Sequence, residues 1–444
     1  MDNPPSPAPL QVAQLDLDGP EGAVIGFGGV GPSPGTGPEI AGGDVYALVR
    51  LRGRPAATVV CRVPPGKNPA DAVAAEARAL LARTPAHPVR DDHAGGHADG
   101  IATDPTDPRE PAPTVSVVIA TRERPEQLAR ALDSLLAQDH PGFEIVVVDN
   151  APLTTGTEDL VSGAYRDRVR YVREEVPGLA IAHNRGVAVA AGEVIAFTDD
   201  DVIADPHWLT ALTAPFAADP GLGCTTGLIL PARLGTPAQI LLESHGGFAK
   251  GFAPRTWDPA APPADEPLFP FTAGSFGSGA NMAFRAAALR AAGGFDPATG
   301  TGTPARGGDD LYAFVSVLAA GHRLCYTPEA LVWHHHRETW RDLTNQAYGY
   351  GAGLTAYLTA LLVRRPALIP ALLRKLPRGL AHARTITAHR DTAEAAVPGA
   401  HGAQGHAWPR QLSRLERRGM LAGPVGYVRA RRRVRGIRPP WHGC

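Results

Sequence analysis

The chain has 444 residues, of which 44% are hydrophobic, together with 50 glycines and 44 prolines. This length allows two or three domains with substantial cores, and the composition excludes a fully disordered chain while predicting many loops. Because 43 basic residues balance 44 acidic ones, the net charge is −1, which argues against a dedicated nucleic-acid-binding protein.

Residues 1–84 are expected to form a small α+β domain in which we find no chemical motif. Short β-rich runs and one helical stretch predict its elements, at residues 11–17, 45–51, 57–63 and 69–82. Residues 85–113 are rich in Pro, Asp, His and Gly and lack apolar periodicity, which predicts a linker. A metal site made of the linker histidines is the less favoured alternative.

From Thr114 the pattern changes to alternating strands and helices. Buried strands are expected at residues 115–120, 144–148, 169–172 and 194–197, with helices after the first strand and over residues 178–191. This α/β alternation predicts a mainly parallel, Rossmann-like sheet with helices on both faces, in a domain spanning residues 114–345. Ligands of such sheets bind beyond the carboxyl ends of the strands, where polar residues gather in this sequence.

The last hundred residues are expected to hold a helical extension, 346–390, broken at prolines 366, 370 and 377, and a poorly ordered tail, 391–444. Between Arg410 and Arg438 there are ten arginines and a single acid, Glu416. A solvated tail is the simpler interpretation. Attraction to an anionic membrane surface or to a phosphate-bearing acceptor is the sharper one, since a basic residue gains about 1 kcal/mol near anionic lipid.

An aspartate triplet at residues 199–201 follows the fourth strand. In extended backbone, alternate side chains point the same way, so Asp199 and Asp201 can face one site while Asp200 faces elsewhere. Two converging carboxylates suit a hard divalent ion such as Mg²⁺ or Mn²⁺, especially one shared with the phosphates of a ligand. A surface acidic turn is the alternative, and the position at the end of a parallel strand counts against it.

Seven motifs occur in the order seen in glycosyltransferase family 2, and together they resemble its GT-A fold domain over about residues 114–337. They are TVSVVIATRER at 114–124, IVVVDN at 145–150, AHNRG at 182–186, VIAFTDDDV at 194–202, GSGANMAFR at 277–285, GGFD at 293–296 and GGDDL at 307–311. The joint occurrence of ordered motifs is much more specific than any one of them.

The resemblance implies a nucleotide-sugar site. Thr121, Arg122 and Glu123 would border the nucleotide, and Asp149 would accept a hydrogen bond from the base, uracil being the usual one. An ionised aspartate is an acceptor only, which suits an imide N–H. The remaining residues expected to contact the nucleotide sugar are Asn184, Asp199, Asp200, Gly279 and Asn281.

The resemblance also implies a Mn²⁺ or Mg²⁺ ion that bridges the diphosphate and neutralises the leaving group. Asp201 and Asp199 would bind it. A histidine of the His334-His335-His336 run would complete the site, and we favour His336 slightly over His334. Histidines that pack or hydrogen-bond beneath the site are the equally weighted alternative.

Asp309 and Asp310 begin a predicted helix, and Asp310 matches the family's general base. An acceptor hydroxyl has too high a pKa to ionise beforehand, so a carboxylate must take its proton during attack on the anomeric carbon. A single displacement of this kind inverts the anomeric centre. Asp309 stands where glutamate is commoner, in a position that would orient the acceptor. Two carboxylates that stabilise a helix N-terminus are the structural alternative.

The sequence departs from the family pattern in two places. His183 stands where arginine is frequent, and the Gln-x-x-Arg-Trp signature of processive synthases is missing, which favours transfer of a single sugar. A sugar-phosphate nucleotidyltransferase would need a Gly-rich basic loop after the first strand, and residues 120–124 contain no glycine. A non-catalytic nucleotide-sugar-binding protein would not need both Asp201 and Asp310.

The expected location is cytoplasmic, and the Arg-rich tail could contact the inner face of the cell membrane. The N-terminus lacks a secretory signal, and four scattered cysteines form neither a metal pattern nor a disulfide framework. The longest uncharged apolar run of the second half, 351–363, is too short to span a bilayer. The acceptor hydroxyl stays open between a cell-envelope glycan, a lipid-linked intermediate and a small natural product.

Overall fold

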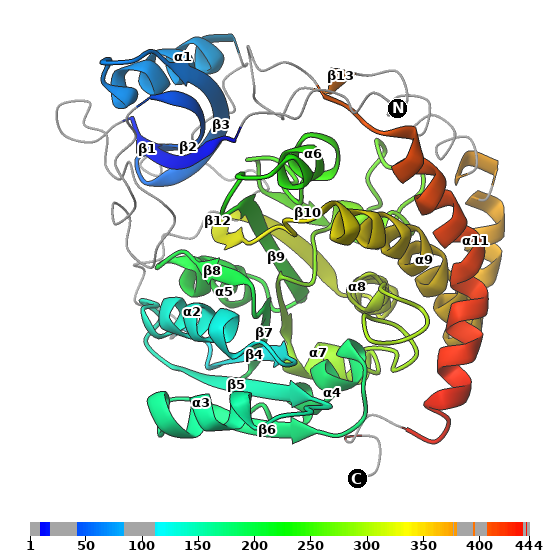
Figure 1. Ribbon diagram of the computed structural model, residues 1–444. Coiled ribbons are helices and arrows are strands. Elements are labelled where there is room, and N and C mark those ends of the chain that lie inside the picture. Colours follow the sequence, from blue (N-terminus) through cyan, green and yellow to red (C-terminus); the bar gives the residue numbers. More distant parts are fainter. Residues whose placement is uncertain are drawn as a thin grey trace.

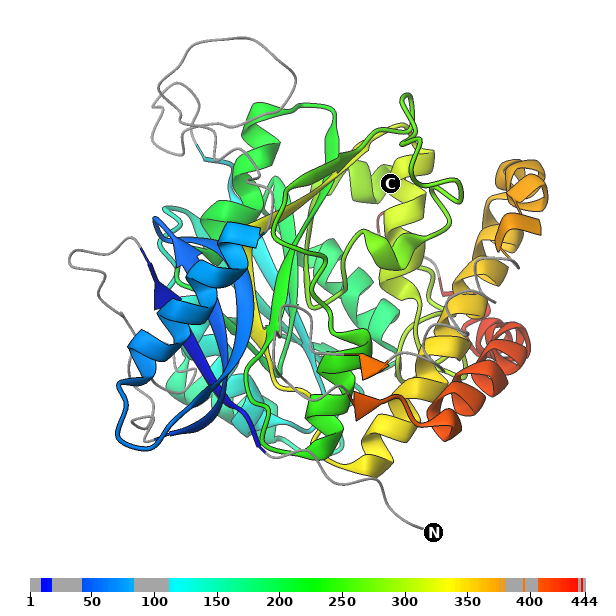
Figure 2. The same cartoon turned by 90° about the horizontal axis from the view of Figure 1, so that it is seen from above.

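The computed structural model describes residues 9–17, 42–83, 112–375, 377–379, 394–395, 406–437 and 441. A nine-stranded sheet with helices on both faces forms its centre. A three-stranded sheet with one helix lies on one side of it, and a pair of long helices lies on the opposite side (Figures 1 and 2).

The central sheet has the order β10-β12-β9-β11-β7-β4-β5-β6, and β8 pairs with β12. Its parallel half consists of β4 (Val115–Thr121), β5 (Phe143–Asn150), β6 (Arg170–Glu174) and β7 (Val194–Asp199). Its mixed half consists of β8 (Val202–Ala204), β9 (Leu222–Pro231), β10 (Arg255–Trp257), β11 (Asn281–Arg285) and β12 (Arg323–His334). The four expected strands of the parallel half are all present.

Helices bury apolar side chains against both faces of this sheet. One face is covered by α2 (Pro125–Leu136), α3 (Gly156–Ala164) and α5 (Trp208–Ala218). The other is covered by α4 (Leu179–Val189), α7 (Ala286–Ala291) and α8 (Asp309–Ala319). In α2, Leu128, Leu132 and Leu135 are buried at the helical spacing that predicted the helix. The expected α/β class is confirmed.

The N-terminal domain contains the expected three strands and one helix, within three residues of the expected bounds. These are β1 (Gln11–Asp16), β2 (Gly43–Leu51), β3 (Arg54–Val63) and α1 (Pro69–Arg83). Alternate residues of β2 face opposite sides of the small sheet. Val45, Ala47 and Val49 pack with α1, whereas Tyr46 and Leu48 pack against the central sheet. The small sheet is therefore covered on both faces.

The C-terminal region differs from the expectation. A single 25-residue helix, α9 (Trp340–Arg364), precedes a 3₁₀ turn at Pro366–Leu368, and α6 (Pro237–Gly246) packs near its start. The expected poorly ordered tail is wrong for residues 410–433, which form α11 (Arg410–Arg433) alongside α9. Its arginines face solvent, while a stripe of small residues is buried at Gly419, Gly423 and Gly426. The high arginine content therefore suggested a solvated tail although one face of the helix is packed.

Short strands β13 (Glu394–Ala395) and β14 (His406–Ala407) pair with each other before α11. The expected linker, residues 85–113, lies almost entirely outside the described residues. Among the residues that are described, no single helix has the length and apolar character needed to cross a membrane. Among these residues, only α9 together with the segment Pro366–Lys375 passes that test, as a pair bent by 109°.

Candidate active site

The carboxyl ends of β4, β5 and β7 meet at one edge of the central sheet. The strand register places Ala120 beside Asp199 and Thr121 beside Asp149. Side chains that are far apart in the sequence therefore converge, as the alternation of strands and helices predicts.

The aspartate triplet divides as its spacing predicts. Asp200 accepts hydrogen bonds from the Thr121 hydroxyl at 2.7 Å and from Arg124 at 3.0 Å. Asp199 and Asp201 instead lie with His334, and potential ligand atoms of these three residues are all within 4.8 Å of one another. Two carboxylates and one imidazole form a donor set that fits Mn²⁺ or Mg²⁺.

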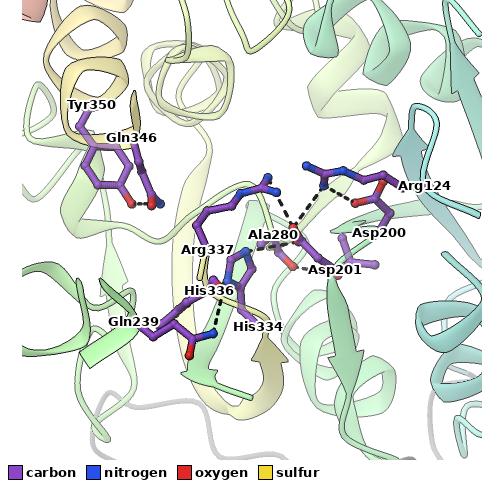
Figure 3. Close-up of polar contacts among 11 residues, drawn as sticks. Arg124, Asp200, Asp201, Gln239, Ala280, His334, His336, Arg337, Gln346 and Tyr350 are labelled. Atoms are coloured by element: carbon purple, nitrogen blue, oxygen red, sulfur yellow. Dashed lines mark hydrogen bonds and ion pairs between the residues drawn. The ribbon is translucent and has the colours of Figure 1, made fainter. Parts of the chain in front are cut away.

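Positive side chains surround Asp201 (Figure 3). His334 Nε2 lies 3.3 Å from its Oδ1, while Arg124 and Arg337 lie 3.3 and 3.6 Å from its Oδ2. Burial opposes ionisation of Asp201, but His334 and the two guanidinium groups outweigh it and hold the pKa well below its usual range. Burial and the charge of Asp201 raise the pKa of Asp199 to about 7.

The preference for His336 over His334 is corrected, because His334 and not His336 lies with Asp199 and Asp201. The imidazole of His336 is buried behind that of His334, with 3.0 Å between their Nδ1 atoms, and its Nε2 lies 3.0 Å from Glu243 Oε2. Both ring nitrogens of His336 therefore already have protein partners. Because alternate residues such as 334 and 336 share one side of an extended chain, spacing alone could not separate the two.

Asp310 is held at the start of α8 by backbone groups. Its Oδ2 accepts the N–H of Gly279 at 3.0 Å and its Oδ1 accepts the N–H of Leu311 at 2.8 Å. Burial and the neighbouring Asp309 raise the pKa of Asp310 to about 6. Gly308, the residue before the helix, has φ +86°, and a Cβ there would lie 2.5 Å from the carbonyl oxygen of Gly353. Only glycine fits this approach of α9.

Asp309 points away from Asp310's partners, toward His183. The carboxylate is buried, and its Oδ2 lies 3.3 Å from His183 Nδ1. The imidazole of His183 packs against the rings of Phe197 and Phe295. This environment suits support of the α8 N-terminus, while the expected acceptor-orienting role of Asp309 stays a prediction.

Asp149 is buried at the end of β5, and one of its two carboxylate oxygens accepts a hydrogen bond from the protein. Its Oδ2 accepts the Tyr171 hydroxyl at 3.0 Å, and no hydrogen-bond partner contacts its buried Oδ1 among the described residues. Burial raises the pKa of this carboxyl group. A buried acceptor without a partner is the arrangement that a base N–H would satisfy.

Residues 116–290 match the family model described as glycosyl transferase family 2. The central domain belongs to this family. The pre-mycofactocin glycosyltransferase of Mycobacterium tuberculosis (strain H37Rv) is 30% identical over 336 residues, which are 75% of this chain and 61% of that relative. The chain thus spans less than two thirds of the relative's length. The validoxylamine A glucosyltransferase of Streptomyces hygroscopicus subsp. jinggangensis is 38% identical over 125 residues, 26% of this chain and 29% of that protein.

Family membership agrees with the GT-A fold expected from the motifs. A solved structure, a mannosyltransferase from Pyrobaculum calidifontis in complex with GDP-Man and Mn²⁺, has a TM-score of 0.44 and 21% identity. The similarity covers 74% of this chain and 88% of that one. A likeness this distant adds nothing to the assignment, which depends on the family match.

Two asparagines of the family 2 motifs serve the fold of the domain, which corrects their expected contact with the nucleotide sugar. The amide of Asn281 donates to the carbonyl oxygens of Leu228 and Ala330 and accepts from Trp208 Nε1. The amide of Asn184 exchanges both of its hydrogen bonds with the backbone of Phe295. Both side chains are buried, so neither amide is available to a ligand.

The loop after β4 contributes in two further ways. Glu123 accepts the backbone N–H groups of Leu153 and Thr154 at 2.7 and 3.1 Å, which lowers its pKa and fixes the loop after β5. Arg122 is exposed at this edge. Sequence reasoning missed Arg124 and Arg337. The available signal was that Arg124 directly follows the expected nucleotide-binding residues 121–123 and that Arg337 directly follows the histidine run.

Proposed function

We propose that the protein transfers one sugar from a nucleoside-diphosphate sugar, with UDP as the nucleotide, to an acceptor hydroxyl, with inversion at the anomeric carbon. The Asp310 carboxylate takes the hydroxyl proton while the acceptor oxygen bonds to the anomeric carbon. The bond from that carbon to the diphosphate oxygen breaks, and its electron pair leaves with the nucleoside diphosphate.

The observation that carries this proposal is the short path of contacts between Asp310 and the metal-ligand cluster. Asp310 accepts the N–H of Gly279, and the carbonyl oxygen of the next residue, Ala280, accepts the Thr198 hydroxyl at 2.9 Å. Thr198 immediately precedes Asp199 on β7. A general base and a diphosphate-binding cluster on one short path are what a single displacement requires.

Asp199, Asp201 and His334 would hold the divalent ion. When bound, that ion neutralises charge that develops on the departing diphosphate. Arg124 and Arg337 orient Asp201, and the free Oδ1 of Asp149 receives the N–H of the nucleotide base. Thr121 fixes Asp200 and thereby the turn that carries both metal-binding aspartates.

A donor panel tests this function. The protein is incubated with Mn²⁺, a set of UDP- and GDP-sugars and a panel of acceptors, and the released nucleoside diphosphate is measured. The panel includes pre-mycofactocin and validoxylamine A, after which two relatives are named. Release from UDP-sugars that depends on acceptor is expected. Pyrophosphate release from sugar phosphates and UTP would instead identify a nucleotidyltransferase, and binding without release would identify a sensor.

Contact with an anionic membrane surface is part of the same proposal. Leu421, Val425 and Val428 are exposed by 82%, 52% and 44% along one face of α11. They stand between Arg417-Arg418 and the run Arg429 to Arg433. Apolar side chains flanked by arginines suit the boundary between anionic headgroups and acyl chains, and would bring the enzyme to lipid-borne substrates.

A further inference from the structure

A chain of buried side chains leads from the metal-ligand cluster into the N-terminal domain. His334, whose Nε2 lies beside Asp201, contacts His336 through the Nδ1 atoms of both rings. His336 Nε2 contacts Glu243 on α6, and the other carboxylate oxygen of Glu243 accepts the hydroxyl of Tyr46 at 3.4 Å. Tyr46 lies on β2, almost two hundred residues away in the sequence.

The hydrogen-bonding capacities of these groups fix one direction for the chain. A carboxylate is an acceptor only, so Glu243 receives both the Tyr46 hydroxyl and the Nε2–H of His336. The Nδ1 of His336 is then a lone pair and accepts the Nδ1–H of His334. With Nδ1 of His334 engaged in this way, its Nε2 faces Asp199 and Asp201 and is the nitrogen that would bind a metal ion in place of its contact with Asp201.

We propose that Tyr46, Glu243 and His336 are positioning residues that hold His334 in its metal-binding tautomer, and that the N-terminal domain completes this support. The inference depends on the metal site of the proposed function. A second contact from β2 agrees with it: Arg50 pairs with Asp205 at 2.5 Å, just after the turn that carries Asp201. The small domain therefore contacts Glu243, which binds His336, and Asp205, which follows Asp201 in the sequence.

The test measures Mn²⁺ binding to the full chain by electron paramagnetic resonance, without nucleotide or acceptor. His336→Phe keeps a ring but removes the acceptor, and we expect Mn²⁺ affinity to fall by about 10- to 100-fold. His336→Asn restores an acceptor near the position of Nδ1 and is expected to recover most of the loss. Thermal unfolding of each variant checks that it is folded. If His336→Phe does not fold, Glu243→Gln replaces it as the variant that disturbs the support of His334.

The part played by the N-terminal domain has its own matched pair. Tyr46→Phe removes the hydroxyl that contacts Glu243, while Tyr326→Phe removes the hydroxyl of another buried tyrosine, which donates to the backbone of Gly251. Only Tyr46→Phe should weaken Mn²⁺ binding. Wild-type affinity in His336→Phe overturns the relay, and equal affinities in the two tyrosine variants overturn the domain's part in it. Absence of Mn²⁺ binding in the wild type would instead refute the metal site itself.

Discussion

Asp310 is the proposed base and also lies at the start of α8, and its substitution separates these two roles. In Asp310→Asn the side-chain oxygen can still accept the Gly279 N–H, but it cannot take a proton. We expect turnover to fall by about 10²- to 10⁴-fold while Mn²⁺ affinity stays unchanged. Asp159→Asn, on an exposed turn of α3, is the control. Turnover close to wild type in Asp310→Asn would refute the base.

The raised pKa of Asp310 predicts an acid limb in the pH profile. Because its pKa is about 6, the carboxyl group is protonated below that pH and cannot act as a base. The specificity constant kcat/KM should therefore fall as the pH decreases through about 6. Asp309→Asn removes one of the causes of the raised pKa, and its acid limb should move to lower pH. A wild-type limb near pH 4, the ordinary range of an aspartate, would contradict the prediction.

Residue patterns predicted the site where backbone geometry dictates it. The alternation of Asp199, Asp200 and Asp201 followed from extended chain, and the structure separates them in that way. The choice between His334 and His336 depended on Glu243, which lies on a distant helix. The burial of Asn281 depended likewise on three strands and a helix that only the assembled sheet brings together.

At the scale of elements, the contact between α9 and α11 depends on glycine. A Cβ on Gly351 would lie 1.9 Å from the carbonyl oxygen of Glu416, whereas one on Gly349 would have its nearest neighbour at 3.6 Å. Gly351→Ala should therefore destabilise the protein by about 1–3 kcal/mol or more. Gly349→Ala should leave stability unchanged or raise it, since alanine favours helix. Chemical denaturation compares the two, and equal midpoints would refute the close contact.

The exposed face of α11 gives the second prediction at this scale. Wild-type protein should sediment with phosphatidylglycerol vesicles at low salt and not with phosphatidylcholine vesicles. Replacing Leu421, Val425 and Val428 together by serine should abolish most of this binding. Leu153→Ser, at an apolar side chain that is 80% exposed on another part of the surface, is the control. Equal sedimentation of all three proteins would remove the membrane from the proposal.

Elements with a clear hydrophobic period were predicted closely, and those whose packing depends on small residues were not. The β4 strand and α2 helix follow simple apolar patterns, so their existence could be read from the sequence. In α11 the buried stripe consists largely of glycine, which carries no hydrophobic signal. Its many arginines suggested a solvated tail, although one face of the helix is packed against α9.

At the scale of the whole molecule, the N-terminal domain packs against the central sheet. Tyr46 and Leu48 of β2, and Val60 of β3, share a buried cluster with Leu230 and Trp333 of the central sheet. Burying each such side chain contributes about 1.5–3 kcal/mol, so separation would expose a costly apolar surface on both partners. The sequence predicted the strands and the helix of this region. It could not predict this packing. The consecutive apolar residues of β2 indicate only that both faces of the strand are covered, and not which element covers each face.

Cleavage of the chain tests whether packing, and not only the covalent connection, holds the domain in place. With a protease site introduced between residues 85 and 111, the two fragments should elute together after cutting. Leu48→Glu places a charge in the buried cluster and should release the N-terminal fragment. Arg54→Gln removes an exposed ion pair to Glu329 and leaves the buried cluster intact, so its fragments should stay together. Because Tyr46 and Arg50 leave with the released fragment, the remaining part should also bind Mn²⁺ more weakly. Separation of the wild-type fragments after cutting would show that the interface is too weak to support the metal site.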